Sequence, residues 1–550
     1  MTEGSVVDTA PSRRSWIGLA ALAAGLGMIV LDGTIVGVAL PTMIGDLGLD
    51  LTDAQWVSSL YAVLLAALLL STGKLADRFG RKRLFLAGIV GFVAGSLGAA
   101  GAAGAGPLLA ARAVQAVGAA LIMPSTLSTV NAVFRGRARA AAFGVWGAVI
   151  SGAAAIGPLA GGLLTQYASW PWVFLVNLPL GAVVFAVAVW AVPETRGTAF
   201  RRGADVDGAL LSAIGFGTLV FAVIEGPDLG WWTPKSDLSL FGWVWPASAP
   251  VSAVPVCLAV SAVALTLFVL WERHRERVQR DALLDLSLFS LRTFSWGNVT
   301  AATVAVGEFA LIFVLPLFLV SALGLTVVQT GLVLAAMAFG AFVSGAAARH
   351  LAARFGAPGT VLIGLALEVV GVLVLVVVLS PSTPGVVIAL PLVVYGLGLG
   401  LASAQLTGTV LRDVPVGVSG QASATQSTVR QIGSALGTAF AGAALSVSLA
   451  LTLPGALSSA GMSGPAAEHL ADATRISAGT VIAQLRAEGS ASALGTQTDA
   501  AIAALSAGFA DATRWSLLVA AAFLALGLVG AARLRRLERA SVRVSPPALR

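Results

Sequence analysis

Two long apolar runs are joined by the charged stretch Gly73-Lys74-Leu75-Ala76-Asp77-Arg78-Phe79-Gly80-Arg81-Lys82-Arg83. A degraded copy returns 276 residues later, again between apolar runs, as Arg349-His350-Leu351-Ala352-Ala353-Arg354-Phe355-Gly356. The Leu, Ala, Arg, Phe and Gly keep their relative positions in the two copies. A charged turn repeated at a fixed offset in an apolar chain predicts two related membrane bundles that move against each other, which is the plan of a secondary transporter.

The composition indicates that lipid is the solvent for most of the surface. Of 550 residues, 57% are hydrophobic and 11% are charged, and the mean hydropathy is +0.91. Soluble domains carry about 25% charged residues. Runs of about 20 apolar residues can span a bilayer. The chain has fourteen such runs, at 16–40, 54–72, 84–105, 107–130, 139–166, 171–192, 207–225, 250–271, 296–322, 326–348, 358–380, 384–411, 420–448 and 514–533.

The repeat offset divides these spans into domains. We expect an all-α integral membrane protein with 14 transmembrane helices: a six-helix bundle in 1–193, two inserted helices with a cytoplasmic connector in 194–292, and a second six-helix bundle in 293–550. The second bundle contains a long outer loop, 449–512, rich in Ala, Ser and Gly, part of which has the spacing of an exposed or interfacial helix.

The basic residues fix the expected orientation. The net charge is +7, and Lys and Arg gather in alternate loops, at 13–14, 74–83, 135–139, 196–202, 273–280, 349–354, 412 and 533–536. The positive-inside bias predicts both termini in the cytoplasm, which requires an even number of spans. Cys257 is the only cysteine, so no intramolecular disulfide can form. No metal-ligand spacing, nucleotide-binding loop or soluble catalytic domain appears, so we expect neither an enzyme nor a cofactor.

Three acids lie within predicted spans. A carboxylate at membrane depth is costly, so Asp32 is expected to face a cavity and carry a proton, or to be a structural group capped by Thr34 or a neighbouring helix. At the repeat offset Asp32 corresponds to Glu308, which precedes Phe309 and Phe313; an acid beside aromatic rings suits a lipophilic cation. The third acid, Glu368, faces either the same cavity or a neighbouring helix. Arg430 is either a topology anchor or a gate partner.

Several motifs together resemble the major facilitator superfamily, specifically its fourteen-helix drug:proton antiporter branch. Residues 31–41 are similar to that branch's D-x-T-I-V…A-L-P helix, and 73–84 to the superfamily's loop between helices 2 and 3. Residues 112–118 resemble R-x-x-Q-G, with Ala116 in place of Gly, and 157–162 resemble the antiporter motif G-P-x-x-G-G. Residues 170–181 resemble the W-R-W-x-F-x-x-N-x-P-x-G start of helix 6, with Pro171 in place of Arg.

The resemblance implies roles for these residues. Arg112, a permanent charge inside a span, would help pass protons together with Asp32 and Glu308, or would only bind backbone carbonyls. The turn would form a conformational gate, with Asp77 accepting from helix amides or from an arginine across the bundle interface, while Gly73 and Gly80 allow tight turns. In helix 5 the glycines would permit close contact, which the motif would use either for export or for packing alone. These site residues are Gly73, Asp77, Arg78, Gly80, Arg81, Gly157, Pro158, Gly161 and Gly162.

The expected protein is a proton-coupled antiporter in a bacterial plasma (inner) membrane. It would export lipophilic drugs, dyes or antibiotics, lipophilic cations among them, from a cavity that includes Asp32, Glu308, Phe309, Phe313 and Glu368. Its partners would be the substrate, protons and the bilayer, without nucleic acid, and we expect a monomer. Two alternatives remain: a narrow-specificity exporter or importer of a metabolite, siderophore, amino acid or lipid on the same fold, and a membrane sensor that transports nothing.

Overall fold

The chain folds into a long bundle of helices. The computed structural model describes residues 12–134, 136–196, 205–240, 243–280, 282–415 and 418–544. The first bundle consists of α1 (Arg13–Leu47), α2 (Leu51–Phe79), α3 (Arg81–Ala100), α4 (Ala105–Val133), α5 (Gly136–Tyr167), α6 (Trp172–Leu175) and α7 (Asn177–Ala191). The inserted pair consists of α8 (Val206–Leu229) and α9 (Ala253–Arg277). A small hairpin of β1 (Leu238–Leu240) and β2 (Trp243–Trp245) lies between them in the chain.

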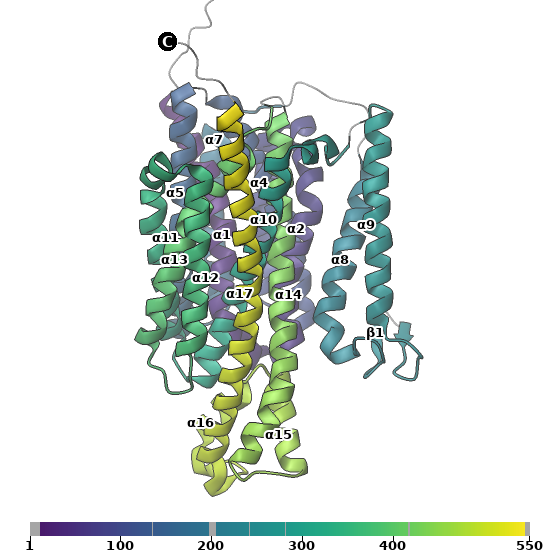
Figure 1. Ribbon diagram of the computed structural model, residues 1–550, viewed down its shortest axis with the longest axis vertical. Helices are drawn as coiled ribbons and strands as arrows, with labels where there is room; N and C mark the ends of the chain where they lie inside the picture. The colour runs from purple at the N-terminus through teal and green to yellow at the C-terminus, as the bar shows by residue number, and fades with distance from the viewer. Residues whose placement is uncertain are drawn as a thin grey trace, which may run out of the picture.

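The second bundle follows a short connector that includes the 3₁₀ turn Leu286–Ser290. Its helices are α10 (Arg292–Leu317), continued by a π-helical turn at Phe318–Ala322, then α11 (Val327–Phe355), α12 (Ala357–Val378), α13 (Gly385–Val410), α14 (Ser419–Ser459) and α17 (Thr498–Val544). Figure 1 shows α8 and α9 side by side at the edge of the molecule, where α8 packs against α2 and α14. The predicted all-α membrane fold is therefore confirmed.

The described residues contain thirteen helical segments that are long and apolar enough to cross a membrane. The remaining predicted span, 139–166, coincides with α5, which has 32 residues, more than the roughly 20 that a bilayer needs. Many side chains of α5, including those of Arg137 and Arg139, lie outside the described residues, as do Arg135, Arg201 and Arg202.

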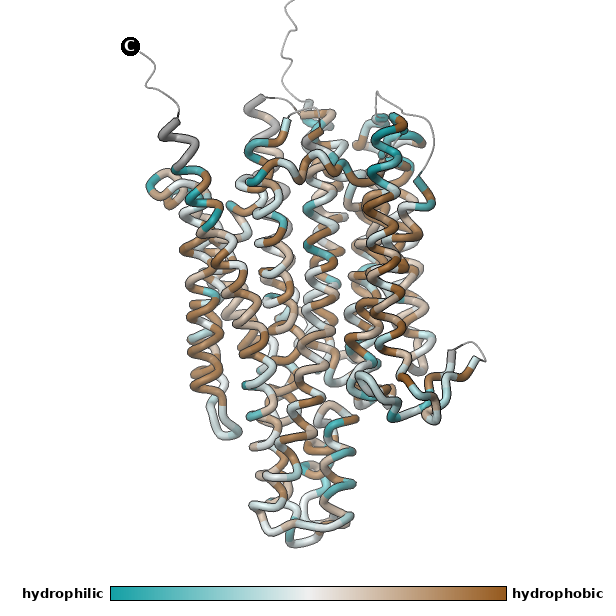
Figure 2. The backbone as a smooth tube through the Cα atoms, turned by 45° about the vertical axis from the view of Figure 1, so that its right-hand side comes forward, coloured by the Kyte–Doolittle hydropathy of each residue, from teal (hydrophilic) through white to brown (hydrophobic). Residues whose placement is uncertain are grey.

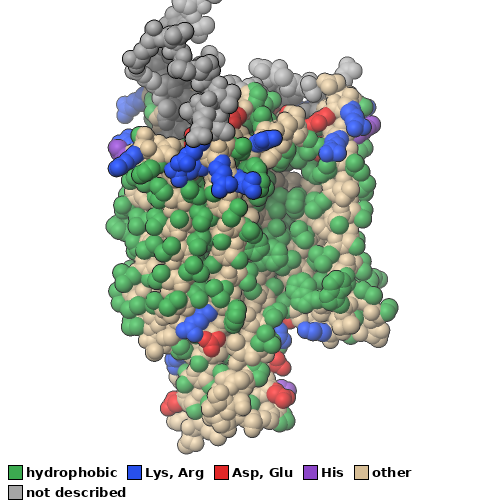
Figure 3. All heavy atoms as spheres, viewed as in Figure 1, with side chains coloured by type: hydrophobic (Ala, Val, Ile, Leu, Met, Phe, Trp, Pro, Cys, Tyr) green, Lys and Arg blue, Asp and Glu red, His purple; other side chains and the backbone are tan. Residues whose placement is uncertain are grey.

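Two ends of the molecule can be distinguished by their contacts. Arg14 donates to the carbonyl of Trp190, Lys74 donates to Ala282 O at 2.5 Å, and Arg412 pairs with Glu538 at 3.1 Å. One face of the molecule, which we call the terminal face, therefore contains the start of α1 and the carboxyl ends of α2, α7, α13 and α17. The opposite end, where α1 meets α2 and α10 meets α11, is the distal face. Figure 3 shows Lys and Arg side chains concentrated at the terminal face.

The charged turn at residues 73–83 is shorter than predicted. Helix α2 continues to Phe79 and α3 begins at Arg81, so only Gly80 breaks the helical path, with φ of +113°. Gly356 has φ of +76° at the matching break between α11 and α12. Residues other than glycine rarely adopt such backbone angles. Gly73 does not form a turn as predicted: it lies inside α2, where an added Cβ would come within 3.4 Å of the Pro124 ring on α4.

The two bundles pack their helices in the same way. On α5, Gly157 and Gly161 face α1, where an added Cβ on Gly161 would lie 2.9 Å from the carbonyl oxygen of Ile35. On α14, Gly433 and Gly437 face α10, where an added Cβ on Gly437 would lie 2.4 Å from the carbonyl oxygen of Val306. Small residues let helix backbones approach closely in lipid. The pairing of these glycines at the repeat offset therefore reflects one shared helix contact.

The segment 449–512 is helical over most of its length, although a loop was predicted. Helix α14 runs 41 residues to Ser459, and α17 starts at Thr498, so both helices extend past the other helices on the distal side. Two shorter helices, α15 (Pro465–Ile476) and α16 (Thr480–Glu488), complete this distal projection. Figure 2 shows that it is less hydrophobic than the spans above it. The segment was predicted as a loop because it is rich in Ala, Ser and Gly, although part of it had helical spacing. Alanine is the best helix former, which explains why most of the segment is helical.

Helix contact in the first bundle depends on glycine at a position that tolerates no side chain. A Cβ on Gly118 of α4 would lie 2.4 Å from the backbone nitrogen of Phe92 on α3. We expect Gly118→Ala to force these helices apart and to destabilise the fold by about 1–3 kcal/mol, the usual cost of overpacking. Gly106→Ala is the matched control, because the space around Gly106, also on α4, is open. Thermal unfolding of the purified variants tests this; equal midpoints for the two would contradict it.

Candidate functional site

Asp32 and Arg112 form a buried ion pair at the centre of the first bundle. The Arg112 Nη1 atom lies 2.5 Å from Asp32 Oδ2, and the two residues are 2% and 1% exposed. Asp32 comes from α1 and Arg112 from α4, so the pair ties two helices that are 80 residues apart in the chain. Charges at membrane depth are costly unless they pair, and here each charge compensates the other.

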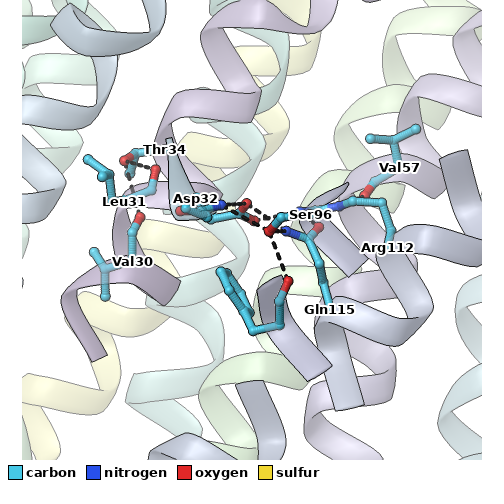
Figure 4. Close-up of polar contacts among 10 residues, drawn as sticks. Val30, Leu31, Asp32, Thr34, Val57, Ser96, Arg112 and Gln115 are labelled. Carbon is cyan, nitrogen blue, oxygen red and sulfur yellow. Dashed lines mark hydrogen bonds and ion pairs between the residues drawn. The ribbon is translucent and has the colours of Figure 1, made fainter. Parts of the chain in front are cut away.

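Gln115 of α4 and polar side chains from two further helices, α3 and α7, complete this cluster (Figure 4). Gln115 Nε2 donates to Asp32 Oδ1 at 3.0 Å and to Ser96 Oγ at 2.7 Å, and Asn177 Nδ2 donates to Asp32 Oδ1 at 3.2 Å. The guanidinium also donates to the carbonyl of Val57 at 3.3 Å. The carboxylate therefore receives three donors, from Arg112, Gln115 and Asn177. Thr34 does not cap it, because its hydroxyl donates to the carbonyls of Val30 and Leu31.

Aromatic rings cover the guanidinium of Arg112. Its Cζ atom lies 4.4 Å from the centroid of the Tyr61 ring and 5.9 Å from that of Phe174. Cation–π contact of this kind is strongest when the cation is desolvated. The sequence motifs included Arg112, Gln115 and Asn177, but no role was assigned to Asn177, and Ser96 and Tyr61 were missed. A polar residue inside an apolar run was the available signal for Ser96.

The corresponding acid of the second bundle is more open. Glu308 on α10 accepts from Arg430 on α14 at 3.1 Å, and the Arg430 side chain is 47% exposed. Arg430 was predicted to be either a topology anchor or a gate partner. In the structure it pairs with an acid, Glu308. Phe309 is half-buried beside Glu308, whereas Phe313 belongs to the buried core. Glu308 itself is buried and only its partner Arg430 is open, whereas both members of the Asp32–Arg112 pair are buried.

Glu368 does not share a site with Asp32. It lies on α12, is fully buried, and packs against α13, where an added Cβ on Gly398 would sit 2.8 Å from Glu368 Cγ. Of its two predicted surroundings, the neighbouring helix is the one that the structure has. Within the described part of the chain its carboxyl oxygens have no hydrogen-bond partner.

The gate residues lie at the terminal end of the first bundle. Asp77 pairs with Arg81 of the same turn at 2.8 Å, and Arg81 Nη1 reaches the carbonyl of Ser128 on α4 at 2.9 Å. Asp77 was expected to bind helix amides or an arginine across the bundle interface, and among the described residues it makes neither contact. Arg78 lies over the ring of Phe79, with its Cζ 5.5 Å from the ring centroid. The copy at Ala353 has no carboxylate to make a matching pair.

The antiporter motif of α5 lies at the contact between the two bundles. An added Cβ on Gly162 would be 2.8 Å from Val327 O, and one on Gly331 of α11 would be 2.6 Å from Pro158 O. Gln166 accepts from the backbone of Val328 at 3.0 Å. On the other side of the interface, an added Cβ on Gly442 of α14 would meet the side chain of Gln55 on α2. These contacts join the bundles tightly toward the distal face.

A polar network reinforces this distal contact, and we call it the distal latch. Asp228 at the end of α8 accepts from Thr52 on α2 at 2.7 Å and pairs with Arg475 of α15 at 3.0 Å. Arg475 also donates to Ser446 on α14 at 3.2 Å. Nearby, burial raises the pKa of the Asp50 carboxyl, and the negative charges of Asp53 and Asp228 act in the same direction. One carboxylate therefore links the first bundle, the inserted pair and the distal projection.

Comparisons with known proteins agree with this architecture. The family model of the Major Facilitator Superfamily matches residues 22–438. The chain belongs to the major facilitator superfamily. It is 34% identical to the puromycin resistance protein pur8 of Streptomyces alboniger, over 78% of this chain and 81% of the relative. It is 32% identical to the multidrug resistance protein Stp of Mycobacterium tuberculosis, over 80% and 78% respectively.

Another relative is an efflux pump, and a similar solved structure is that of a transporter. The multidrug efflux pump LfrA of Mycolicibacterium smegmatis is 30% identical, over 80% of this chain and 82% of the relative. Among solved structures, a bacterial homologue of the human lysosomal transporter Spinster, in an inward-facing and unoccupied conformation, matches with a TM-score of 0.60. It is 18% identical, and the match covers 96% of this chain and 98% of that one, which shows the shared fold.

The buried pair of the first bundle makes a quantitative prediction. Arg112→Gln leaves the Asp32 charge buried and should destabilise the fold by about 3–5 kcal/mol, whereas the double variant with Asp32→Asn should recover much of that loss. Arg430→Gln is the control: its pair is partly exposed and should cost no more than about 1 kcal/mol. Thermal unfolding in detergent measures all three. A double variant no more stable than Arg112→Gln would show that the charges do not depend on each other.

The distal latch predicts a shift in conformation. Arg475→Gln removes the cation that holds the distal projection to Asp228, so the bundles should separate more often at the distal face. Spin labels on α5 and α11 near Gln166 and Val328 would report a larger population of long distances. Arg514→Gln is the control, because Arg514 pairs with Asp511 on its own helix and donates to the carbonyl of Leu379, both within the second bundle. Unchanged distances in Arg475→Gln would show that the latch does not contribute to closure.

Proposed function

We propose that this protein exports lipophilic drugs, dyes or antibiotics from the cell in exchange for protons. The named relatives are multidrug or antibiotic resistance proteins, which supports drug export in general. The exchange for protons rests on the buried Asp32–Arg112 pair. The terminal face, with its concentration of basic side chains, is then cytoplasmic, and the membrane is the plasma membrane of a bacterium.

The proton step follows from the chemistry of the cluster. Protonation of Asp32 removes the negative charge that balances Arg112, and a lone guanidinium at this depth is costly. Arg112 would then have to find other acceptors or move, and either change alters the contact between α1 and α4. Binding of one proton is thereby linked to a rearrangement of the first bundle. Gln115 and Asn177 hold the carboxylate in place and act as positioning residues.

The substrate step is assigned to the second bundle and the interface. Arg430 is open while Glu308 is buried behind it, next to Phe309 in the chain, so an incoming lipophilic cation that displaced Arg430 would pair with Glu308 and contact the ring. In the state described here the bundles are joined at the distal face, so the substrate would arrive from the terminal side. Separation at the distal face, with closure at the Gly80 turn, would complete alternating access. The close contact of Gly162 and Gly331 toward the distal face would open in that step.

The free energy released by proton entry decides whether protons alone can drive export. Each proton contributes about 2.3 kcal/mol per 100 mV of membrane potential. It contributes about 1.4 kcal/mol more for each unit of the pH gradient. A single proton in an energised cell can therefore support a substrate gradient of at least about a hundredfold. No nucleotide is needed.

Ethidium efflux tests the proposal directly. Cells that express the protein should lose preloaded ethidium, and a protonophore should abolish this efflux because it removes the driving gradient. Asp32→Asn leaves Arg112 unpaired and lowers stability, so it is compared at equal amounts in the membrane; there it should show only background efflux, since its side chain cannot release a proton. Asp511→Asn, which changes an exposed carboxylate away from the site, serves as the control. Efflux that continues after the gradient is collapsed would exclude proton coupling.

A further inference from the structure

An arginine-lined hollow lies on the terminal face, between α12 and α17. Its volume is about 170 Å³, and its lining consists of Leu362, Ala532, Arg535, Arg536 and Arg539. Leu362 comes from the first turns of α12, and the other four come from the last turns of α17. The hollow is therefore cationic on one side and apolar on the other. It is remote from Asp32 and Glu308 and has no part in the proposed exchange.

The charge of this hollow is not balanced within the protein. Arg535, Arg536 and Arg539 form no ion pair with a carboxylate among the described residues. The one acid in this part of α17, Glu538, pairs with Arg412 at 3.1 Å. The nearby Arg533 lies over the ring of Trp296, with its Cζ 5.7 Å from the centroid. Three guanidinium groups around one hollow thus have unused donors that fit the oxygens of a phosphate.

The start of α12 adds to the positive potential. The Nε atom of Arg535 lies 3.8 Å from the position of a Cβ added to Gly359, in the first turn of that 22-residue helix. The amino end of a helix carries a partial positive charge. The carboxylate of Glu538 lies at the same end, because a Cβ added to Gly356 would be 3.2 Å from Glu538 Oε2. The arginines that line the hollow outnumber this one carboxylate, so the net charge beside the start of α12 is positive.

The position of the hollow relative to the hydrophobic band of the surface indicates which kind of anion it binds. In Figure 3 the basic side chains over the end of α17 lie directly at the edge of the hydrophobic band, where the phosphates of a bilayer would be. Leu362 and Ala532 face the same hollow and would contact the glycerol and the first acyl carbons of a lipid. Basic pockets between helices at the cytoplasmic side are a known way to hold anionic headgroups.

We propose that this hollow binds the phosphodiester headgroup of an anionic phospholipid from the adjoining leaflet. The guanidinium groups of Arg535, Arg536 and Arg539 donate to the phosphate oxygens, and the apolar wall holds the lipid at that depth. A zwitterionic lipid offers the same phosphate together with a cation that the arginines repel. The site therefore selects lipids with net negative charge.

Lipid binding to the purified full chain tests this proposal without any transport assay. Phosphatidylglycerol is titrated into the protein in detergent, and bound lipid is counted by native mass spectrometry. The triple variant Arg535→Gln, Arg536→Gln, Arg539→Gln should bind its tightest phosphatidylglycerol at least ~10-fold more weakly. The matched control removes three exposed arginines from the end of α9, as Arg273→Gln, Arg277→Gln and Arg280→Gln, and should bind it as the unmodified protein does.

Further arms separate the alternatives. Phosphatidylcholine should bind weakly to every variant, and excess inorganic phosphate should not displace phosphatidylglycerol. The triple Lys variant keeps the charge and the topology, and should bind with intermediate strength because lysine lacks the planar fork. Equal losses in the α9 control and the hollow variant would overturn the proposal in favour of a general surface charge. Displacement by inorganic phosphate would overturn it in favour of a free-anion site.

Discussion

The need to neutralise charge inside lipid organises the first bundle. Asp32 and Arg112 can both be present at the centre of the membrane only because they lie 2.5 Å apart and because Gln115, Asn177 and the carbonyl of Val57 satisfy their remaining hydrogen bonds. That cluster takes one group from nearly every helix around it. A change in the protonation of one carboxyl is therefore felt by the whole bundle, which is what a transporter driven by protons requires.

The same constraint is met differently in the two bundles. The second bundle carries its acid, Glu308, at the interface, where the exposed Arg430 pairs with it and where an external cation could take the arginine's place. The first bundle is thus suited to hold a proton and the second to meet a substrate. Contact between the bundles rests on glycines such as Gly162 and Gly331 and on the distal latch at Asp228. The inserted pair α8 and α9 takes part in that latch, although it stands outside both bundles.

Much of the fold was predictable because periodic signals in the chain are local. The length of each apolar run gave the spans, and the copy of the charged turn gave the division into two related bundles. Predictions failed where a residue's environment depends on another helix. Gly73 was expected at a turn but packs inside α2 against Pro124. The segment 449–512 was read as a loop because its composition is polar and small, yet its alanines continue α14 and α17 well beyond the membrane-spanning core.

By itself, the sequence determined the class of the protein, the number and limits of its spans, the superfamily motifs and the presence of three acids at membrane depth. These follow from hydrophobicity and local spacing, which a chain carries before it folds. Only the tertiary structure decided which partner each acid has: Arg112 for Asp32, Arg430 for Glu308, and no hydrogen-bond partner among the described residues for Glu368. Pairing depends on distances of a few ångströms between helices that are far apart in the chain, and no local pattern encodes such distances.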